Sequence, residues 1–242
     1  MNVIKNCIFM LLLVFGLISQ AQEKLKDTIP LKDIYGFRVG LDVSNPIRTL
    51  FNEDRKSLEI IGDYRINKKL YAAVELGFLD KKTLEDHLDY TTNGQYIKIG
   101  ANYNLYENWL DMDNEVFVGM RYGLSTFKQT LHSYTVYSDS SLPEIDNVID
   151  KEFSGLTANW GELVFGMKVE TFHNIFLSAS FSFKKIISTK EPENFKNLYA
   201  PGFDRIFLNN GGIGFNYVIS YRLPLYKKNK ISVEEPDDKE AR

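Results

Sequence analysis

The sequence predicts an all-β protein, an antiparallel up-and-down transmembrane β-barrel of eight strands, with ten strands as the alternative. Three observations lead to this prediction. First, Gly211–Tyr226 alternates between large apolar and small or polar side chains, which is typical of a β-strand with two different faces. Second, seven earlier segments repeat that alternation. Third, an export signal precedes all of them.

Residues 1–21 are predicted to be a secretory signal peptide. Lys5 provides the basic start, Ile8–Ile18 the apolar core, and Ser19-Gln20-Ala21 the small residues that a signal peptidase reads. The apolar core is too short to span a bilayer as a helix. The single cysteine, Cys7, lies in this signal, so we expect no thiol, disulfide or cysteine-based metal site in the exported chain.

The composition of the rest suits one exported barrel domain. Residues 22–33 are charged and include Pro30, which predicts a short disordered leader, and the barrel is expected over 34–226. The chain has 29 basic and 32 acidic residues and no basic stripe, so no nucleic-acid partner is expected. Its 17 Phe and 14 Tyr would supply the aromatic girdles of a membrane barrel.

The first four strands are predicted over Ile34–Ser44, Ser57–Ile66, Lys69–Leu79 and Gly94–Leu105. In each, large side chains recur at every second position and therefore share one face. In order, these sets are Tyr35, Phe37, Val39, Leu41 and Val43; Leu58, Ile60, Tyr64 and Ile66; Leu70, Ala72, Val74, Leu76 and Phe78; and Ile97, Ile99, Ala101, Tyr103 and Leu105.

The last four strands are predicted over Glu115–Phe127, Asn159–Glu170, Ile175–Lys185 and Gly211–Tyr226. Their large sets are Val116, Val118, Met120, Tyr122 and Leu124; Leu163, Phe165, Met167 and Val169; Ile175, Leu177, Ala179, Phe181 and Phe183; and Ile213, Phe215, Tyr217, Ile219, Tyr221 and Leu223. The tail, 227–242, is charged and lacks aromatic residues, which predicts a disordered periplasmic end.

The connections between strands alternate in length, which independently supports a membrane barrel. The links after strands two, four and six are short: 67–68, 106–114 and 171–174. The links after strands one, three, five and seven are longer and polar: 45–56, 80–93, 128–158 and 186–210. Transmembrane barrels have short periplasmic turns and long outer loops, so both termini are predicted to be periplasmic.

Two other architectures compete with this prediction. Thr130–Tyr137 alternates weakly and pairs plausibly with Val148–Leu156, either as two more barrel strands or as a hairpin extended above the membrane. A soluble periplasmic β-sandwich that binds a ligand would turn the large side chains inward instead. An eight-stranded barrel is too narrow to hold four or five large residues from each strand, whereas its small and polar face fits inside.

The charged residues on the small face are expected to line the lumen. In so narrow a space they must pair, because an unpaired buried charge is costly. The favoured interpretation is a set of salt bridges that closes the barrel, and the alternative is a narrow pore whose small positive excess favours anions. The predicted lumen charge network consists of Arg38, Asp42, Glu59, Asp63, Arg65, Glu75, Lys98, Arg121, Glu162, Lys168, Lys184 and Arg222.

The three histidines do not form a recognisable site. His87 lies among the carboxylates of Leu84–Asp89, but without a second nearby histidine a solvated loop is favoured over a metal site. His132 and Ser133 point to opposite faces of an extended strand, so His132 is not expected to activate Ser133. His173 stands in a predicted turn. We therefore expect no catalytic residue, cofactor site or metal site, and no enzyme activity.

The export signal ending SQAQ, the eight alternating segments and the final YRLPLY resemble the small outer-membrane β-barrel proteins of Gram-negative bacteria. This resemblance implies an outer-membrane location, with outer-membrane lipid around the barrel, but no site. The chain departs from the pattern where the tail 227–242 follows Tyr226. The expected role is structural or surface interaction, with loops 128–158 and 186–210 contacting an extracellular or protein partner. A narrow pore for small solutes is second, and a rim hydrolase acting on lipid or peptide is third.

Overall fold

A computed structural model describes residues 32–51, 54–85, 88–106, 108, 113–136, 145–192 and 197–229. The predicted signal peptide, residues 22–31 of the predicted leader and residues 230–242 of the predicted tail lie outside these described residues. Of the described residues, no helix is long and apolar enough to cross a membrane.

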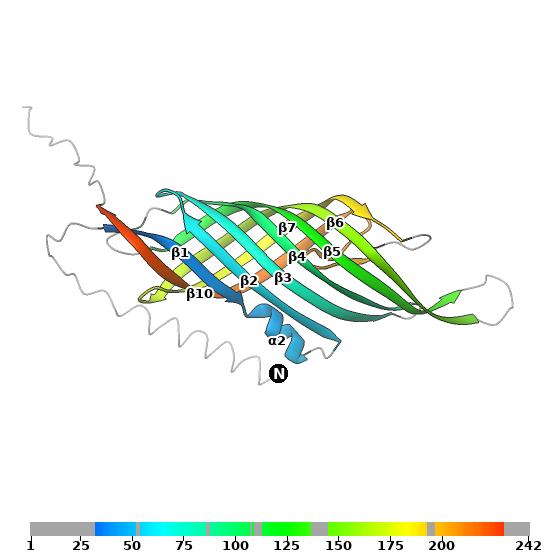
Figure 1. The fold of residues 1–242 in the computed structure, drawn as a ribbon. Helices are drawn as coiled ribbons and strands as arrows, with labels where there is room; N and C mark the ends of the chain where they lie inside the picture. The colour runs from blue at the N-terminus through cyan, green and yellow to red at the C-terminus, as the bar shows by residue number, and fades with distance from the viewer. Residues whose placement is uncertain are drawn as a thin grey trace, which may run out of the picture. The chain divides into compact units, whose positions relative to one another are not determined.

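Eight antiparallel strands close into a barrel in the order β1-β10-β7-β6-β5-β4-β3-β2 (Figure 1). Each barrel strand pairs with the barrel strands before and after it in the sequence, and β1 pairs with β10 to complete the ring. The eight-stranded barrel is thereby confirmed, while the ten-stranded alternative is wrong. The two-sheet sandwich is also wrong, because a closed ring has no second sheet to pack against. The strands are β1 Lys32–Asp42, β2 Arg55–Arg65, β3 Leu70–Glu85, β4 Leu88–Asn104, β5 Glu115–Val136, β6 Ile145–Phe172, β7 Ile175–Lys190 and β10 Gly211–Asn229.

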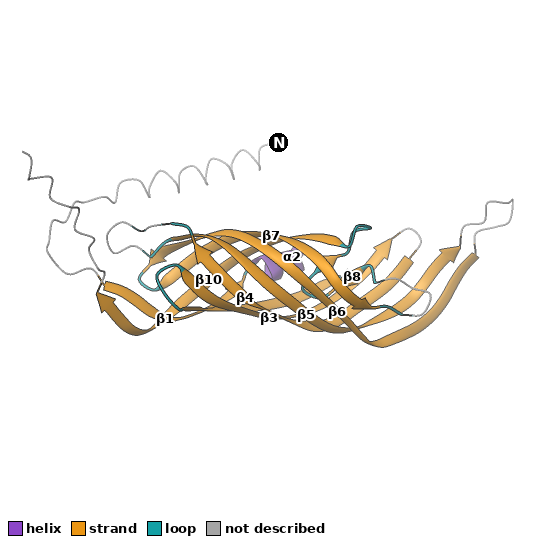
Figure 2. Ribbon diagram, turned by 90° about the horizontal axis from the view of Figure 1, so that it is seen from above, coloured by secondary structure: helices purple, strands orange, loops and turns teal. Residues whose placement is uncertain are grey.

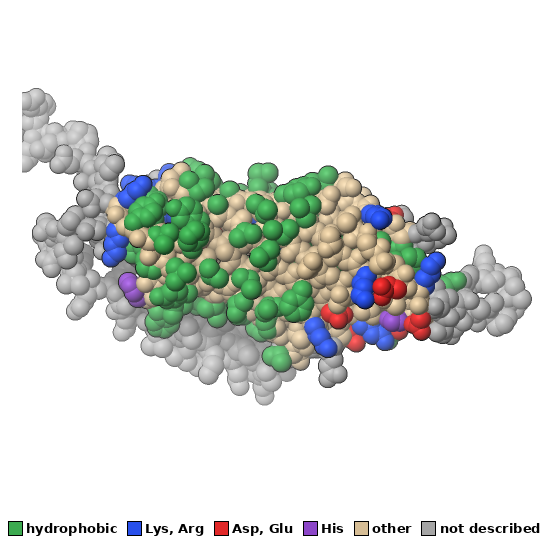
Figure 3. Space-filling model, viewed as in Figure 1, with side chains coloured by type: hydrophobic (Ala, Val, Ile, Leu, Met, Phe, Trp, Pro, Cys, Tyr) green, Lys and Arg blue, Asp and Glu red, His purple; other side chains and the backbone are tan. Residues whose placement is uncertain are grey.

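Large apolar side chains cover the outside of all eight strands, as the period-two pattern predicts. Figure 3 shows this belt as hydrophobic side chains along the barrel wall, with acidic and basic groups gathered at one end and basic groups at the other. Charged and small residues alternate with them on the inside. Gly123 is one of these, since a Cβ there would lie 2.1 Å from the ring of Trp160, which fills the lumen beside it.

The first and last strands differ from the prediction at their outer limits. β1 begins at Lys32, inside the predicted leader, and β10 continues to Asn229, inside the predicted tail. Tyr35 was expected on the apolar outer face but is buried and stacks on Tyr226, with ring centroids 5.1 Å apart. The cause is a register shift between Tyr35 and Gly36, which breaks the period-two pattern at that point.

Two predicted loops are largely strand. Most of 80–93 forms a hairpin in which Glu85 pairs with Leu88. Within 128–158, β5 and β6 continue as a tall hairpin with Ser133 opposite Val148, which confirms the predicted pairing as an extension of existing strands (Figure 2). Both extensions rise beyond the apolar belt, where Leu79, Tyr90 and Leu131 are buried on the inner side and the alternation that marks the lipid-facing strands no longer applies.

The remaining long connections contain small elements that the sequence pattern did not indicate. Helix α2, Ser44–Phe51, follows β1, and the Asp42 side chain caps it by accepting a hydrogen bond of 2.8 Å from the backbone N–H of Ser44. Between β7 and β10, the short strands β8, Tyr199–Ala200, and β9, Asp204–Arg205, form a sheet of their own. We call the barrel end with α2 and the tall hairpin the loop end, and the opposite end the terminal end.

Candidate functional site

All twelve residues of the predicted lumen charge network are buried inside the barrel, none with more than 7 % of its surface exposed. Nearest the loop end, four of them form a chain across four neighbouring strands. Lys98 Nζ lies 2.9 Å from Glu59 Oε1 and 2.9 Å from Glu75 Oε2. Arg121 Nε lies 2.9 Å from the other oxygen of Glu75. Both carboxylates, Glu59 and Glu75, are therefore paired with a cation.

A second cluster lies deeper in the lumen. Asp63 bridges two cations, with Oδ1 2.6 Å from Arg38 Nε and Oδ2 2.5 Å from Lys168 Nζ. Arg38 also pairs with Glu115 and stacks over the ring of Tyr71, 4.6 Å from its centroid. Because these groups come from opposite walls of the ring, their pairing fills the cross-section between those walls.

A third cluster closes the terminal end. Arg65 and Arg222 have no predicted carboxylate as a partner; Asp113, in the β4–β5 connection, instead reaches both of them. Arg65 also lies 3.3 Å from Asp33, and Arg222 lies 2.9 Å from Glu170. A residue from a turn thus folds back into the barrel and joins β2 to β10.

The other three predicted residues are held mainly by neutral or distant groups. Asp42 accepts hydrogen bonds from the side-chain amides of Asn45, at 2.9 Å, and Asn216, at 2.8 Å. Glu162 lies 3.8 Å from Lys184 and accepts a hydrogen bond of 2.6 Å from the Trp160 indole. Their surroundings are more polar than ionic.

Sequence reasoning missed six charged residues, four of them members of these clusters and two, Arg55 and Asp204, that pair with each other at the loop end. Two of the six could have been predicted, because residues an even number of positions apart in a strand share a face. Glu115 shares the inner face with Arg121, and Glu170 shares it with Glu162 and Lys168. The others lie at an element's edge or in a connection, where no period-two pattern applies. The six are Asp33, Arg55, Asp113, Glu115, Glu170 and Asp204.

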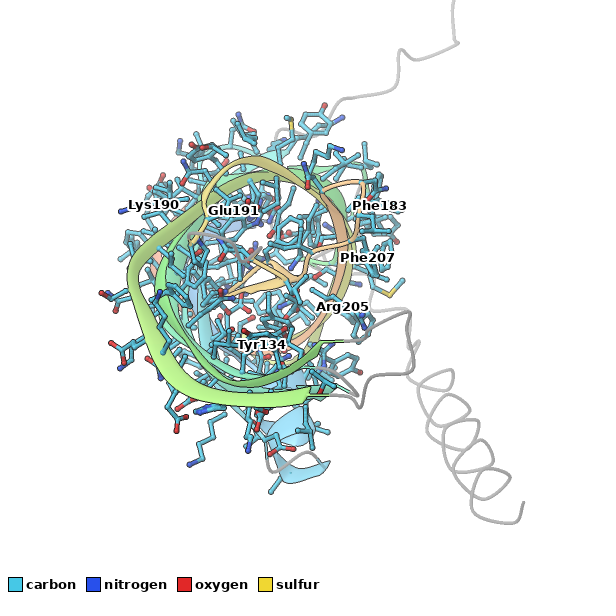
Figure 4. All side chains as sticks on the ribbon, turned by 90° about the vertical axis from the view of Figure 1, so that its right-hand side faces the viewer. Tyr134, Phe183, Lys190, Glu191, Arg205 and Phe207 are labelled. Atoms are coloured by element: carbon cyan, nitrogen blue, oxygen red, sulfur yellow. The ribbon has the colours of Figure 1, made fainter. Side chains whose placement is uncertain are left out.

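The connection between β7 and β10 turns inward at the loop end and forms a cap, residues 197–206. Figure 4, viewed from that end, shows its two short strands lying across the ring. Phe203 is fully buried, with its ring edge-on to Trp160 and the centroids 5.9 Å apart. Gly202 has a φ of +79°, and a Cβ there would lie 2.6 Å from the Tyr96 ring, so only glycine fits.

Polar contacts fasten the cap to the barrel wall. Arg55 donates a hydrogen bond of 2.6 Å to the Tyr199 hydroxyl, and its Nη2 lies 3.1 Å from Asp204 Oδ1. Lys184 donates a hydrogen bond of 2.8 Å to the backbone carbonyl of Gly202. Burial alone would raise the pKa of Asp204, but the positive charges of Lys184 and Arg55 outweigh it and hold that pKa well below its usual range.

A small polar cavity remains beneath the cap and α2, with Asn45, Glu59, Lys98 and Asp204 among its lining residues. Its volume is about 20 Å³, which is room for about one water molecule. A cavity of this size and polarity suits a single bound water molecule.

His132 makes contacts that the sequence did not indicate. Its Nε2 lies 2.9 Å from Thr91 Oγ1 and its Nδ1 lies 2.7 Å from Asp150 Oδ1, so both ring nitrogens are engaged away from Ser133. These contacts tie β4, β5 and β6 together outside the barrel. His173 is exposed in the β6–β7 turn, and His87 lies outside the described residues. The described part of the chain holds no group of three or more residues suited to a metal ion.

A family model described as a domain of unknown function, DUF6048, matches residues 1–228. No curated protein matches the chain. Two solved structures are similar. One is Ail, the attachment invasion locus protein of Yersinia pestis, with 9% identity over 81% of this chain and 100% of that one, at a TM-score of 0.38. The other is Neisserial surface protein A, with 13% identity over 79% of this chain and 99% of that one, at a TM-score of 0.38. At these values the likeness adds no argument to the barrel's own geometry.

Proposed function

This chain belongs to the DUF6048 family, and we propose that it is an integral outer-membrane barrel with a structural or surface-interaction role and a lumen closed to solutes. The observation that carries this proposal is the division of side chains by the barrel wall. Large apolar groups are exposed on all eight strands, while charged groups are buried and paired within. Only lipid suits such an exterior, and a closed barrel suits lipid because its strands satisfy every backbone group of the wall.

The closed lumen is supported by barriers at three levels. The cap covers the loop end, the two ion-pair clusters fill the middle, and Asp113 joins Arg65 to Arg222 at the terminal end. Because membrane barrels have their short turns in the periplasm, the terminal end would be periplasmic and the loop end would face outward. The barrel would then serve as a rigid support for its outer elements.

Conductance across a planar bilayer tests the closed lumen. We expect a flat trace from the intact barrel. As a matched control, a variant without the cap and with Glu59, Glu75, Lys98 and Arg121 changed to serine should conduct in steps, provided that it still shows the heat-modifiable mobility of a folded barrel. Steps from the intact protein would overturn the closed lumen.

A narrow pore is the second candidate, and the wall formed by β1, β10 and β7 favours it. The buried hydroxyls of Ser182 and Ser220 on this wall have no hydrogen-bond partner within the described residues. Water would satisfy these hydroxyls. An anion preference in the steps of the intact protein would support this candidate.

The surface role is assigned to the tall hairpin, with a protein or other cell-surface partner and no catalytic step. The hairpin carries paired charges on its outer side, such as Lys128 with Glu152 at 3.1 Å. Gln129 and Phe153 are directly opposite each other, so an Asn-Gly turn can replace residues 130–152 and leave the rest of β5 and β6 in register. This deletion should abolish adhesion of cells that display the protein, while the barrel remains heat-modifiable. Undiminished adhesion would contradict the assignment.

A further inference from the structure

Helix α2 has one side fixed to the barrel mouth and the other side uncovered. Asn45 is buried, donates to Asp42 at 2.9 Å, and accepts a hydrogen bond of 3.2 Å from Arg55. These bonds prevent the helix from rotating. Ile47 and Leu50 consequently point away from the barrel, and 82% of the Leu50 surface is exposed.

The turn that precedes β10 carries a second group of exposed apolar side chains, Phe207 and Leu208. The backbone N–H of Phe207 donates to the carbonyl of Gly211 at 3.1 Å, and that of Asn210 donates to the carbonyl of Phe207 at 2.8 Å. Lys185 Nζ donates a further hydrogen bond of 2.5 Å to the carbonyl of Asn209. This well-bonded turn leaves Leu208 fully exposed and Phe207 about half exposed.

Both features continue the apolar belt. Phe207 and Leu208 line one open groove, of about 610 Å³, together with the belt residues Phe183 and Ile213. Figure 4 shows Phe183 and Phe207 close together on the outside of the ring. Arg48 ties α2 to the same wall by donating a hydrogen bond of 3.3 Å to the backbone carbonyl of Phe215, another belt residue.

We propose that Ile47, Leu50, Phe207 and Leu208 form a lipid anchor that inserts into the outer leaflet along the wall of β7, β10 and β1. The inference rests on the proposed membrane location and adds an interaction surface to it. An exposed apolar patch continuous with a lipid-facing belt fits the same lipid phase. Arg48 and Lys185 lie beside it, where a cation suits the phosphate of a lipid headgroup.

The location of the anchor also explains an asymmetry of the loop end. The wall formed by β3 to β6 continues outward as hairpins with charged outer faces, exemplified by Lys82 with Asp89 and Lys128 with Glu152. The wall of β10 and β1 stops near the belt, and Ile47, Leu50, Phe207 and Leu208 lie exposed in the connections beside it. Lipid contact on this side would hold the cap at the membrane surface and leave the tall hairpin free to meet a partner.

Site-directed quenching tests the anchor. Since the only native cysteine is Cys7, in the predicted signal peptide, single-cysteine variants of the exported chain carry one label each. Leu50→Cys and Leu208→Cys, labelled with an environment-sensitive fluorophore, are folded into phosphatidylcholine vesicles with and without doxyl-labelled lipid. Phe215→Cys, in the belt, is the lipid control, and Lys128→Cys, on the tall hairpin, is the water control.

We expect the labels at positions 50 and 208 to be quenched by doxyl lipid about as strongly as the label at 215, and several-fold more than the label at 128. Quenching by aqueous iodide alone would overturn the anchor, and so would protection from both quenchers, which would indicate a protein cover. Failure of doxyl lipid to quench even the label at 215 would instead contradict the membrane location itself.

Discussion

At the scale of single residues, the lumen depends on charges that compensate one another at short range. Lys98 is the clearest case, because it lies between two buried carboxylates, Glu59 and Glu75, at 2.9 Å from each. A buried ion pair adds little by itself, but removing one partner leaves a charge that neither water nor protein satisfies. Removing one member of a cluster should therefore destabilise the barrel by more than the net contribution of its ion pair.

Lys98→Met should lower the free energy of unfolding by about 3 kcal/mol, because it leaves two carboxylates facing each other in the lumen. Urea unfolding of the barrel in lipid vesicles measures this change. The double variant Lys98→Met/Glu59→Gln should recover part of the loss, since it removes the charge of Glu59, while Glu75 keeps its ion pair with Arg121. Equal stability of the single and double variants would contradict the pairing.

Gly202 makes a second residue-scale prediction. Its φ of +79° and the adjacent Tyr96 ring leave no room for a side chain. Gly202→Ala should cost about 1–2 kcal/mol locally and loosen the cap from the mouth. Limited proteolysis should then cut within 197–206 in the variant but not in the native protein. As a control, Gly161→Ala, where a Cβ meets nothing closer than 4.0 Å, should leave the cleavage pattern unchanged.

At the scale of elements, the cap and the tall hairpin divide the loop end between them. The cap turns inward and combines an apolar wedge, Phe203, with the ionic fastening of Asp204 by Arg55. The hairpin turns outward, and His132 joins its two strands to β4 through Asp150 and Thr91. One element thus closes the barrel, while the other is available for contact.

The fastening of the cap should depend on pH through Asp204. Its pKa is lower in the folded protein than in the unfolded chain, so its contribution is complete above the ordinary value of about 3.9 and is lost as the pH falls toward the lowered value. Asp204→Asn should therefore destabilise the protein at neutral pH, with a difference from the native protein that shrinks as the solution becomes strongly acidic. Parallel urea titrations of both proteins measure it, and a constant difference at all pH values would refute the ionic fastening.

At the scale of the whole molecule, closure of the sheet is the dominant fact. The ring leaves no free strand edge in its wall, and we expect such a folded barrel to resist detergent until it is heated. The barrel should therefore fractionate with the outer membrane and migrate as a compact band that shifts after boiling. A protein found soluble in the periplasm, without a heat-dependent shift, would contradict the membrane location.

The sequence by itself determined the barrel class, the favoured number of strands, their limits within the apolar belt and the sidedness of most residues there, while the extensions of β5 and β6 were predicted as loop. These follow from local period-two alternation and from strand length, as in Gly211–Tyr226. It also placed twelve charged residues on the inner face, because alternation assigns a residue to a face, but it missed Glu115 and Glu170 on the same face. It missed α2 and the cap, since short irregular elements carry no periodic signal.

Only the tertiary structure decided which charge meets which. Lys168 and Asp63 are 105 positions apart, and Arg222 and Asp113 are 109 apart, so their contact depends on the register of strands around the ring. A single register shift was enough to turn Tyr35 from the lipid face to the lumen. Alternation is a property of one strand, whereas pairing across a lumen is a property of the closed barrel, and this physical difference separates what could be predicted from what could not.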